Sequence, residues 1–130
     1  MARGGSSSSS NPKISALIVE DHRPTSMLHE AILKRNNMET KVVNNGKHAV
    51  ELHSKGERFD VIFMDYNMPE MNGAQATKKL REMGVRSMIV GVTSCTDFER
   101  VEFMAAGLDK CFKKGLTRAM VEEVLQKLKE

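Results

Sequence analysis

The sequence predicts an α/β fold, in which five parallel strands form one sheet and helices cover both of its faces. Short, continuously apolar segments alternate five times with segments whose apolar residues recur at helical spacing. Apolar runs without polar alternation are typical of strands buried on both faces, as in a parallel sheet. The length of 130 residues, with 40% hydrophobic and 28% charged residues, suits one globular domain.

The five strand segments are short and rich in β-branched and other apolar residues. Polar turn residues bound them, as Asn44, Asn45 and Gly46 do after the second segment. The fifth segment is the weakest, because it contains few apolar residues. The predicted strands are residues 14–20, 40–44, 59–65, 87–93 and 108–112.

A helix is predicted after each strand segment. Pro24 suits the first position of the first helix, and Thr117 suits the N-cap of the last. Gly56, Gly84 and Gly107 mark the ends of the second, third and fourth helices. The apolar stripes, each on one face of its helix, are Met27, Leu28, Ala31 and Ile32; Ala49, Val50 and Leu52; Ala76, Leu80 and Met83; Phe98, Val101, Met104 and Ala105; and Met120, Val121, Val124, Leu125 and Leu128.

Charge and composition argue against nucleic acid and membranes as partners. The formal net charge is +3, but Arg3 and Lys13 lie in the Ser/Gly-rich residues 1–13, which we expect to be a flexible tail before a single domain at 14–130. The domain is therefore nearly neutral, and aromatic residues make up only 5%. No apolar run has the length of a membrane span and no secretory signal is present, so we expect the protein in the cytoplasm or nucleus. The sequence shows no sustained exposed apolar patch, so we expect a monomer.

Polar and charged residues stand where the predicted strands end. In parallel sheets the ligand site lies at the carboxyl ends of the strands, beside the point where strand order reverses. Like charges held close together either take up protons or bind a cation, and oxygen ligands suit Mg²⁺. The strand-end residues are Glu20 and Asp21, Asp65 and Asn67, Thr93, and Lys114.

The same residues suit phosphoryl transfer. Mg²⁺, the Lys114 ammonium and the Thr93 hydroxyl together match three phosphoryl oxygens, and Asp65 is placed to be the nucleophile. A carboxylate is already ionised at neutral pH, so it can displace a phosphoramidate leaving group such as phosphohistidine without a strong base.

Four segments resemble the receiver domain of two-component response regulators. They are LIVED at 17–21, MDYNMPEMNG at 64–73, VGVTS at 90–94 and the G-L-D…K-K region at 107–114. The likeness extends over residues 14–129 and is greatest to the plant single-domain, type-C regulators, through TKKLREMGVRSMIVGVTS at 77–94. It implies the flavodoxin-like doubly wound (βα)5 fold, with five parallel strands in the order 2-1-3-4-5.

The resemblance also implies a role for each strand-end residue. Asp65 is the phosphoacceptor, and Thr93 and Lys114 hold the phosphoryl group. The implied Mg²⁺ ligands are Asp21, Asp65, the backbone carbonyl of Asn67 and, through water, Glu20. The implied donor is a histidine-containing phosphotransfer protein, and its candidate contacts are Met27, Leu28, Ala31 and Met68, the first three of which could equally belong to the core.

The chain departs from the receiver pattern at two positions. Gly115 stands where receivers carry proline after the lysine, so we expect a trans or mobile geometry at the bond between Lys114 and Gly115 and a less firmly placed lysine. Cys111 stands where receivers carry an aromatic residue that moves inward with the threonine. Cysteine is too small for that movement, so the usual output switch is in doubt.

The chain ends at Glu130, directly after the last predicted helix, so we expect no output domain. Such a protein would act by protein contact or as a sink, in which the phosphorylated aspartate hydrolyses much as in a phosphohistidine phosphatase. The alternative is a degenerate receiver that binds partners without being phosphorylated. A flavodoxin-like electron carrier, a dehalogenase-type phosphatase and a GTPase fit less well, because their phosphate loop, second aspartate and GxxxxGK[ST] motif are missing.

Other polar residues are expected at the surface. The histidines lack metal-ligand spacing; we expect His22 to face solvent and the other three, His29, His48 and His53, to be exposed or partly buried. A solvated helix face is expected to carry Lys78, Lys79 and Arg81.

Overall fold

The computed structural model describes residues 13–130, and it contains the predicted parallel sheet. Five strands pair in parallel in the order β2-β1-β3-β4-β5, which confirms the predicted fold class. The strands are β1 (Ile14–Val19), β2 (Met38–Val43), β3 (Val61–Met64), β4 (Met88–Thr93) and β5 (Lys110–Lys113). Strand order reverses between β1 and β3, so the carboxyl ends of these two strands flank the place where a ligand site is expected.

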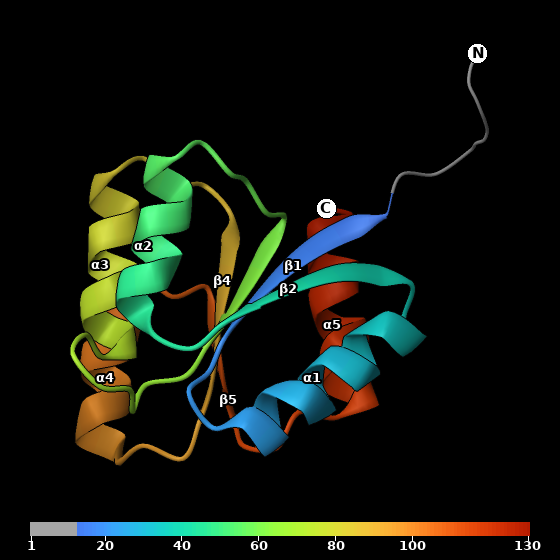
Figure 1. Cartoon of the computed structure of the whole chain (residues 1–130). Coiled ribbons are helices and arrows are strands. Elements are labelled where there is room, and N and C mark those ends of the chain that lie inside the picture. The colour runs from blue at the N-terminus through green and yellow to red at the C-terminus, as the bar shows by residue number, and fades with distance from the viewer. Residues whose placement is uncertain (1–12) are drawn as a thin grey trace.

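Helices cover both faces of the sheet, as Figure 1 shows. On one face lie α1 and α5, and on the other α2, α3 and α4. Their bounds are α1 (Arg23–Arg35), α2 (Gly46–Ser54), α3 (Gly73–Glu82), α4 (Asp97–Ala105) and α5 (Arg118–Leu128). None of these helices combines the length and the apolarity that a membrane crossing requires.

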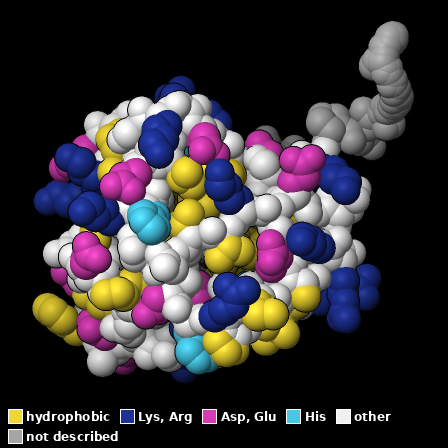
Figure 2. Space-filling model, viewed as in Figure 1, with side chains coloured by type: hydrophobic (Ala, Val, Ile, Leu, Met, Phe, Trp, Pro, Cys, Tyr) yellow, Lys and Arg dark blue, Asp and Glu magenta, His cyan; other side chains and the backbone are white. Residues whose placement is uncertain are grey.

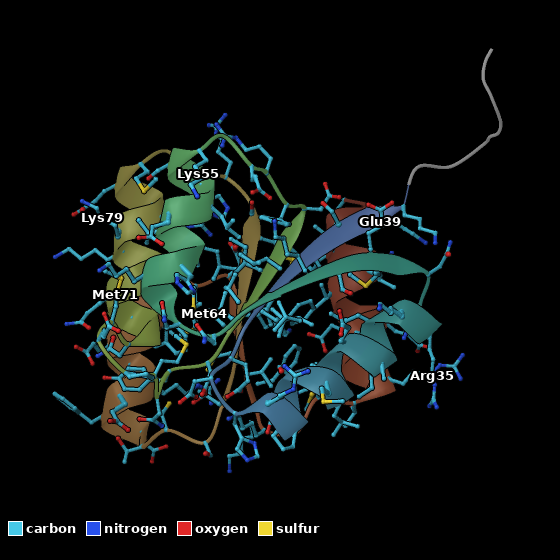
Figure 3. The ribbon with its side chains drawn as sticks, viewed as in Figure 1. Arg35, Glu39, Lys55, Met64, Met71 and Lys79 are labelled. Carbon is cyan, nitrogen blue, oxygen red and sulfur yellow. The ribbon has the colours of Figure 1, made fainter. Side chains whose placement is uncertain are left out.

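Each face of the sheet has its own hydrophobic core. Alternate residues of β1 contribute to different cores, with Leu17 and Val19 packing under α2, α3 and α4, and Ala16 and Ile18 packing under α1 and α5. Figure 3 shows Met64 of β3 on the α2–α3 side, while Lys79 extends outward from α3. The continuous apolar runs of the sequence therefore mark strands that are covered on both sides.

Side-chain N-caps mark where four of the five helices begin. Asn45, Asn72, Thr96 and Thr117 each accept a backbone hydrogen bond as N-caps, and α3 and α4 have complete capping boxes. Such a cap contributes about 1 kcal/mol. Pro24 lies in the first turn of α1, as predicted.

The buried face of α4 differs from the prediction. Phe98, Val101 and Met104 are 82%, 69% and 39% exposed, whereas Phe103 is fully buried. Phe103 fills space left by two glycines, because a Cβ on Gly73 or Gly91 would approach its ring to 2.8 or 3.0 Å. Burial of this ring fixes the rotation of the helix and turns the predicted stripe to solvent.

Two histidines and one arginine are more buried than predicted. His29 and His53 are 3% and 4% exposed, and His53 Nδ1 is hydrogen-bonded to the carbonyl of Ala49 at 2.7 Å, which satisfies one polar atom of a core residue. Arg81 is half-buried and donates to the carbonyls of Val85, Ser87 and Gly107 and to Asp109. Arg81 can be half-buried because these four acceptors satisfy its guanidinium. Lys78 and Lys79 of the same helix are exposed, as predicted.

Candidate functional site

The predicted site residues lie together at the carboxyl edge of the sheet, where the strands end. Backbone hydrogen bonds continue the strand pairing one residue further and hold this edge. The Asp65 N–H donates to the Val19 carbonyl at 3.0 Å, and the Lys114 N–H donates to the Thr93 carbonyl at 3.2 Å. The Glu20 N–H likewise donates to the carbonyl that ends β2, at 3.1 Å. The backbone of the site is therefore as firmly fixed as the sheet itself.

Three carboxylates converge at this edge. Each of Glu20, Asp21 and Asp65 offers an oxygen, and the three oxygens lie within 4.8 Å of one another. Glu20 and Asp65 are 3% and 4% exposed, while Asp21 faces solvent. Burial and the charge of Asp65 raise the pKa of Glu20, against the opposing effect of Lys114. The cluster is thus a set of hard oxygen ligands with unfavourable mutual repulsion, which fits a divalent cation such as Mg²⁺.

Lys114 partly compensates this negative charge. Its Nζ lies 3.0 Å from Glu20 Oε1 and 3.3 Å from Asp65 Oδ2. Burial by itself lowers the pKa of Lys114, but the two carboxylates outweigh burial and raise the pKa above its ordinary value. Lys114 is therefore a cation at neutral pH and touches the predicted phosphoacceptor directly.

Thr93 has a buried hydroxyl without a hydrogen-bond partner among residues 13–130. The residue is 3% exposed, and its Oγ1 has no hydrogen-bond partner within residues 13–130. An unsatisfied buried hydroxyl costs about 1–3 kcal/mol, so such a group calls for an explanation. An oxygen of a ligand held beside Asp65 and Lys114 would supply the missing partner.

The loop after Asp65 approaches its neighbours too closely for a side chain at Gly73. A Cβ there would lie 2.2 Å from the Asp65 carbonyl oxygen, and the Gly73 N–H donates to the Tyr66 carbonyl at 2.8 Å. The Tyr66 N–H donates to Asp65 Oδ1 at 2.9 Å. The Asp65 side chain is thus oriented by the residue that follows it, and Gly73 allows the loop to close over it.

The positions that depart from the receiver pattern lie beside the site. Cys111 is half-buried and its Sγ points toward Gly91 of β4, 3.3 Å from where a Cβ would stand. The bond between Lys114 and Gly115 is cis, so the predicted trans geometry is wrong. That prediction weighed only the local preference of a bond before a non-proline residue and took no account of the contacts of Lys114 in the folded protein.

The partner-contact candidates are divided between the surface and the core. Met27 and Leu28 of α1 are 56% and 57% exposed and Ala31 is exposed, so these three are not core residues. Figure 2 shows hydrophobic side chains gathered over α1, at the lower right. Met68 is half-buried and packs against the core under α2, α3 and α4. Asn67 is exposed, two residues beyond Asp65.

Sequence reasoning missed His29 and Tyr66 as neighbours of the site. His29 lines, with Glu20 and Asp65, a gap too small to hold a water molecule. Burial, and next the charge of Lys114, lower the pKa of His29, which favours a neutral imidazole. The buried positions Ser26, His29 and Leu33 do recur at helical spacing, but the polar residue types concealed that stripe.

Comparison with known proteins agrees with this geometry. The family model of the response regulator receiver domain matches residues 16–126 of this chain. Two-component response regulator ARR22 of Arabidopsis thaliana is 48% identical over 118 residues, which are 88% of this chain and 83% of that protein. Two-component response regulator 24 of the same plant is 44% identical over 117 residues, covering 89% and 84% of the two chains.

A solved structure shows the same architecture with a metal. The receiver domain of sensor histidine kinase PA1611 from Pseudomonas aeruginosa, described with a magnesium ion coordinated in its active site cleft, has a TM-score of 0.81 and 28% identity. The match covers 92% of this chain and 100% of that one. The acidic cluster described above occupies the edge of the sheet where such a fold holds its ligand.

Proposed function

This chain belongs to the response regulator receiver domain family, and from that premise we propose that it is a phosphorelay receiver that takes a phosphoryl group onto Asp65. The proposed donor is the phosphohistidine of a histidine-containing phosphotransfer protein. The observation that carries the proposal is a buried Asp65 carboxylate in contact with Lys114, inside an acidic cluster and near the unpaired hydroxyl of Thr93.

The residues present fit Mg²⁺, because three carboxylate oxygens lie close enough to share one ion. We assign Asp21 and Asp65 as direct ligands, the backbone carbonyl of Asn67 as a third, and Glu20 as a ligand through water. A bound Mg²⁺ supplies charge neutralisation for the phosphoryl oxygens. Repulsion within the cluster makes the site dependent on such an ion.

In the proposed transfer, an oxygen of Asp65 forms a bond to phosphorus while the bond from phosphorus to the histidine nitrogen of the donor breaks. The leaving nitrogen keeps the electron pair of that bond. The ammonium of Lys114 and the hydroxyl of Thr93 stabilise the charge on the transferred group, which is the main task in phosphoryl transfer. No general base is needed, since a carboxylate nucleophile carries no proton that must be removed.

We propose that the phosphorylated form then hydrolyses, so that the protein drains phosphoryl groups from the relay or signals briefly by contact. A water oxygen attacks the phosphorus, the Asp65 carboxylate is restored and inorganic phosphate leaves. The exposed residues Met27, Leu28 and Ala31 of α1, next to the site, are the proposed docking surface for the donor, with Met68 at its border. The proposed active unit is a monomer.

The test is transfer from a radiolabelled, phosphorylated phosphotransfer protein to the full chain, with Mg²⁺ or with a chelator. We expect label on the wild-type chain only when Mg²⁺ is present, and none on Asp65→Asn. Asp97→Asn is the matched control, because Asp97 is an exposed aspartate on α4, and it should accept label like the wild type. Label that never leaves the donor contradicts the proposal and favours the degenerate receiver, to which the departures at Cys111 and Gly115 point. Label that reaches Asp65→Asn equally well contradicts Asp65 as the acceptor.

A further inference from the structure

We propose that Tyr66 couples the phosphorylation state of Asp65 to the position of α4, acting as a positioning residue through its hydrogen bond with Glu102. The inference rests on the proposed function, since it takes Asp65 as the residue that is modified.

The backbone of Tyr66 is in direct contact with the modified group. Its N–H donates to Asp65 Oδ1 at 2.9 Å, so the acceptor is the carboxylate that would carry the phosphoryl group. Hydrogen bonds to an ionised acceptor are roughly twice as strong as neutral ones. Conversion of this carboxylate to an acyl phosphate removes its charge and weakens the bond. Tyr66 is therefore in direct contact with the group that changes when Asp65 is phosphorylated.

The side chain of Tyr66 reaches α4. Its ring is 7% exposed and packs edge-on against the ring of Phe103, with 5.5 Å between the ring centres. Its hydroxyl donates to Glu102 Oε1 at 2.5 Å. One residue thus joins the site to two consecutive residues of α4.

Few other contacts hold α4 in place. Phe103 is its one buried residue, whereas α3 buries five. A hollow of about 400 Å³ is lined by residues of both helices, with Glu102, Ala105 and Ala106 on one side and Ala74, Gln75 and Lys78 on the other. Segments with few buried apolar contacts are the ones that shift or open most readily. The anchors of α4 are therefore its Phe103 ring and its bond to Tyr66.

The Phe103 ring touches the loop that Asp65 begins. A Cβ on Gly73, at the end of that loop, would lie 2.8 Å from Phe103 Cζ. The link from Asp65 to α4 is therefore a chain of direct contacts rather than a path inferred from distance. Because α4 carries the exposed residues Phe98, Val101 and Met104, any shift of the helix changes how this apolar stripe is presented.

The test follows the amide chemical shifts of the full chain on addition of Mg²⁺ and beryllofluoride, a mimic of the acyl phosphate. In the wild type we expect shifts at Thr93 and Lys114 and throughout α4. Tyr66→Phe keeps the ring and removes only the hydroxyl, so the shifts at Thr93 and Lys114 should persist while those in α4 fall to less than half. A purely structural role for the hydroxyl would lower stability without separating the two sets of shifts.

Two further variants complete the experiment. Glu102→Ala removes the acceptor at an exposed position, so it should reproduce the effect even where Tyr66→Phe folds poorly. Glu122→Ala is the matched control, since Glu122 is an exposed helical glutamate that pairs with Arg118 on α5. It should respond like the wild type.

Each outcome decides a different claim. Equal α4 shifts in wild type, Tyr66→Phe and Glu102→Ala overturn the coupling, and so does a wild type in which Thr93 shifts and α4 does not; both leave the proposed function standing. Absence of any shift at Thr93 and Lys114 in the wild type overturns the proposed function and the coupling with it.

Discussion

At the edge of the sheet where the strands begin, Asp60 and Asp109 each accept hydrogen bonds from the backbone of another segment. At the opposite edge, Glu20 and Asp65 also accept backbone hydrogen bonds, but their carboxylates and that of Asp21 lie close to one another. Asp60 accepts from the N–H of Ser15 at 2.9 Å, and Asp109 accepts from the N–H of Ile89 at 2.9 Å. The carboxyl edge gives its acids one lysine and leaves a nearby hydroxyl unpaired. Acidic residues therefore stabilise the edge where the strands begin, whereas at the carboxyl edge their mutual repulsion lowers stability.

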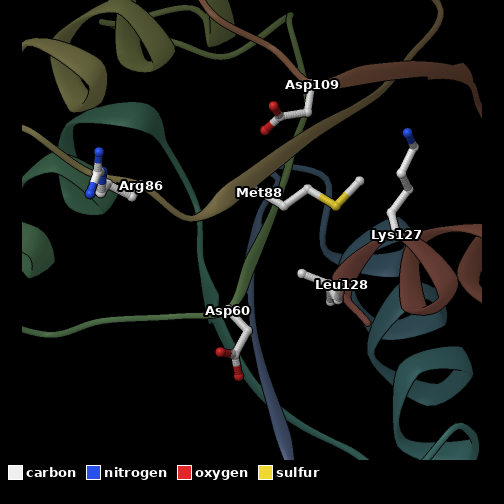
Figure 4. Close-up of a pocket in the computed structure, with 6 residues that line it drawn as sticks. All are labelled: Asp60, Arg86, Met88, Asp109, Lys127 and Leu128. Atoms are coloured by element: carbon white, nitrogen blue, oxygen red, sulfur yellow. The ribbon is translucent and has the colours of Figure 1, made fainter. Parts of the chain in front are cut away.

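The amino edge also has an open hollow, but its charges are largely matched. Figure 4 shows this hollow of about 400 Å³, lined by Asp60, Arg86, Met88, Asp109, Lys127 and Leu128. Its two carboxylates are already satisfied by donors from neighbouring strands and from Arg81. Groups left unsatisfied in a folded protein concentrate at functional sites. The contrast between the two edges therefore favours the carboxyl edge as the functional one.

The largest expected effect is at the amino edge. Arg81→Ala removes the donor to three carbonyls and to Asp109, which lies 2.8 Å from its guanidinium, so we expect a loss of about 2–3 kcal/mol in the free energy of unfolding. Arg86→Ala is the control, an exposed arginine of the same hollow, and should stay within about 0.5 kcal/mol of the wild type. Urea unfolding measures both, and equal losses would remove the contrast between the edges.

A gain of about 1 kcal/mol is expected at the carboxyl edge from Glu20→Gln at neutral pH without Mg²⁺. Burial and the charge of Asp65 raise the pKa of Glu20, so its stabilising contribution is present below the ordinary pKa of 4.5 and is lost as pH rises through the folded value. The gain should therefore disappear in acid, and added Mg²⁺ should stabilise the wild type more than the variant. A variant less stable than the wild type at pH 7 would show that this edge is not strained by charge.

The smallest expected effect concerns His29, beneath the carboxyl edge. Burial lowers the pKa of His29, so its stabilising contribution is present above the ordinary pKa of 6.5 and is lost as pH falls through the folded value. Compared with the wild type, His29→Leu should lose less stability between neutral pH and pH of about 5. His48→Leu, at an exposed position, should keep the pH profile of the wild type in thermal unfolding. Parallel profiles for all three proteins would contradict a neutral His29.

The main features of the fold followed from patterns that are local in the chain. Continuous apolar runs predicted β1, β3 and β4, and capping residues such as Thr117 marked where helices begin. Strand boundaries shifted by a few residues, since β2 begins at Met38 rather than at residue 40. The convergence of Glu20, Asp21 and Asp65 was predictable because parallel strands end at one edge.

The features that the sequence did not predict are the buried face of α4 and the contacts between residues far apart in the chain. The stripe Phe98, Val101 and Met104 has helical spacing, yet Phe103 is buried because it fits the space beside two glycines from distant segments. Likewise, the bonds of Arg81 to Gly107 and Asp109 and the contact of Tyr66 with Glu102 of α4 join residues 26–36 positions apart. No local pattern contains such pairs.

The sequence by itself determined the alternation of strands and helices, the parallel sheet and the chemistry at its carboxyl edge, because periodicity and strand ends are properties of neighbouring residues. Only the tertiary structure decided which side of α4 is buried, that His29 lies under the site and that Tyr66 connects Asp65 to α4. These depend on packing and hydrogen bonding between segments far apart in the chain, whose energy exceeds any local preference.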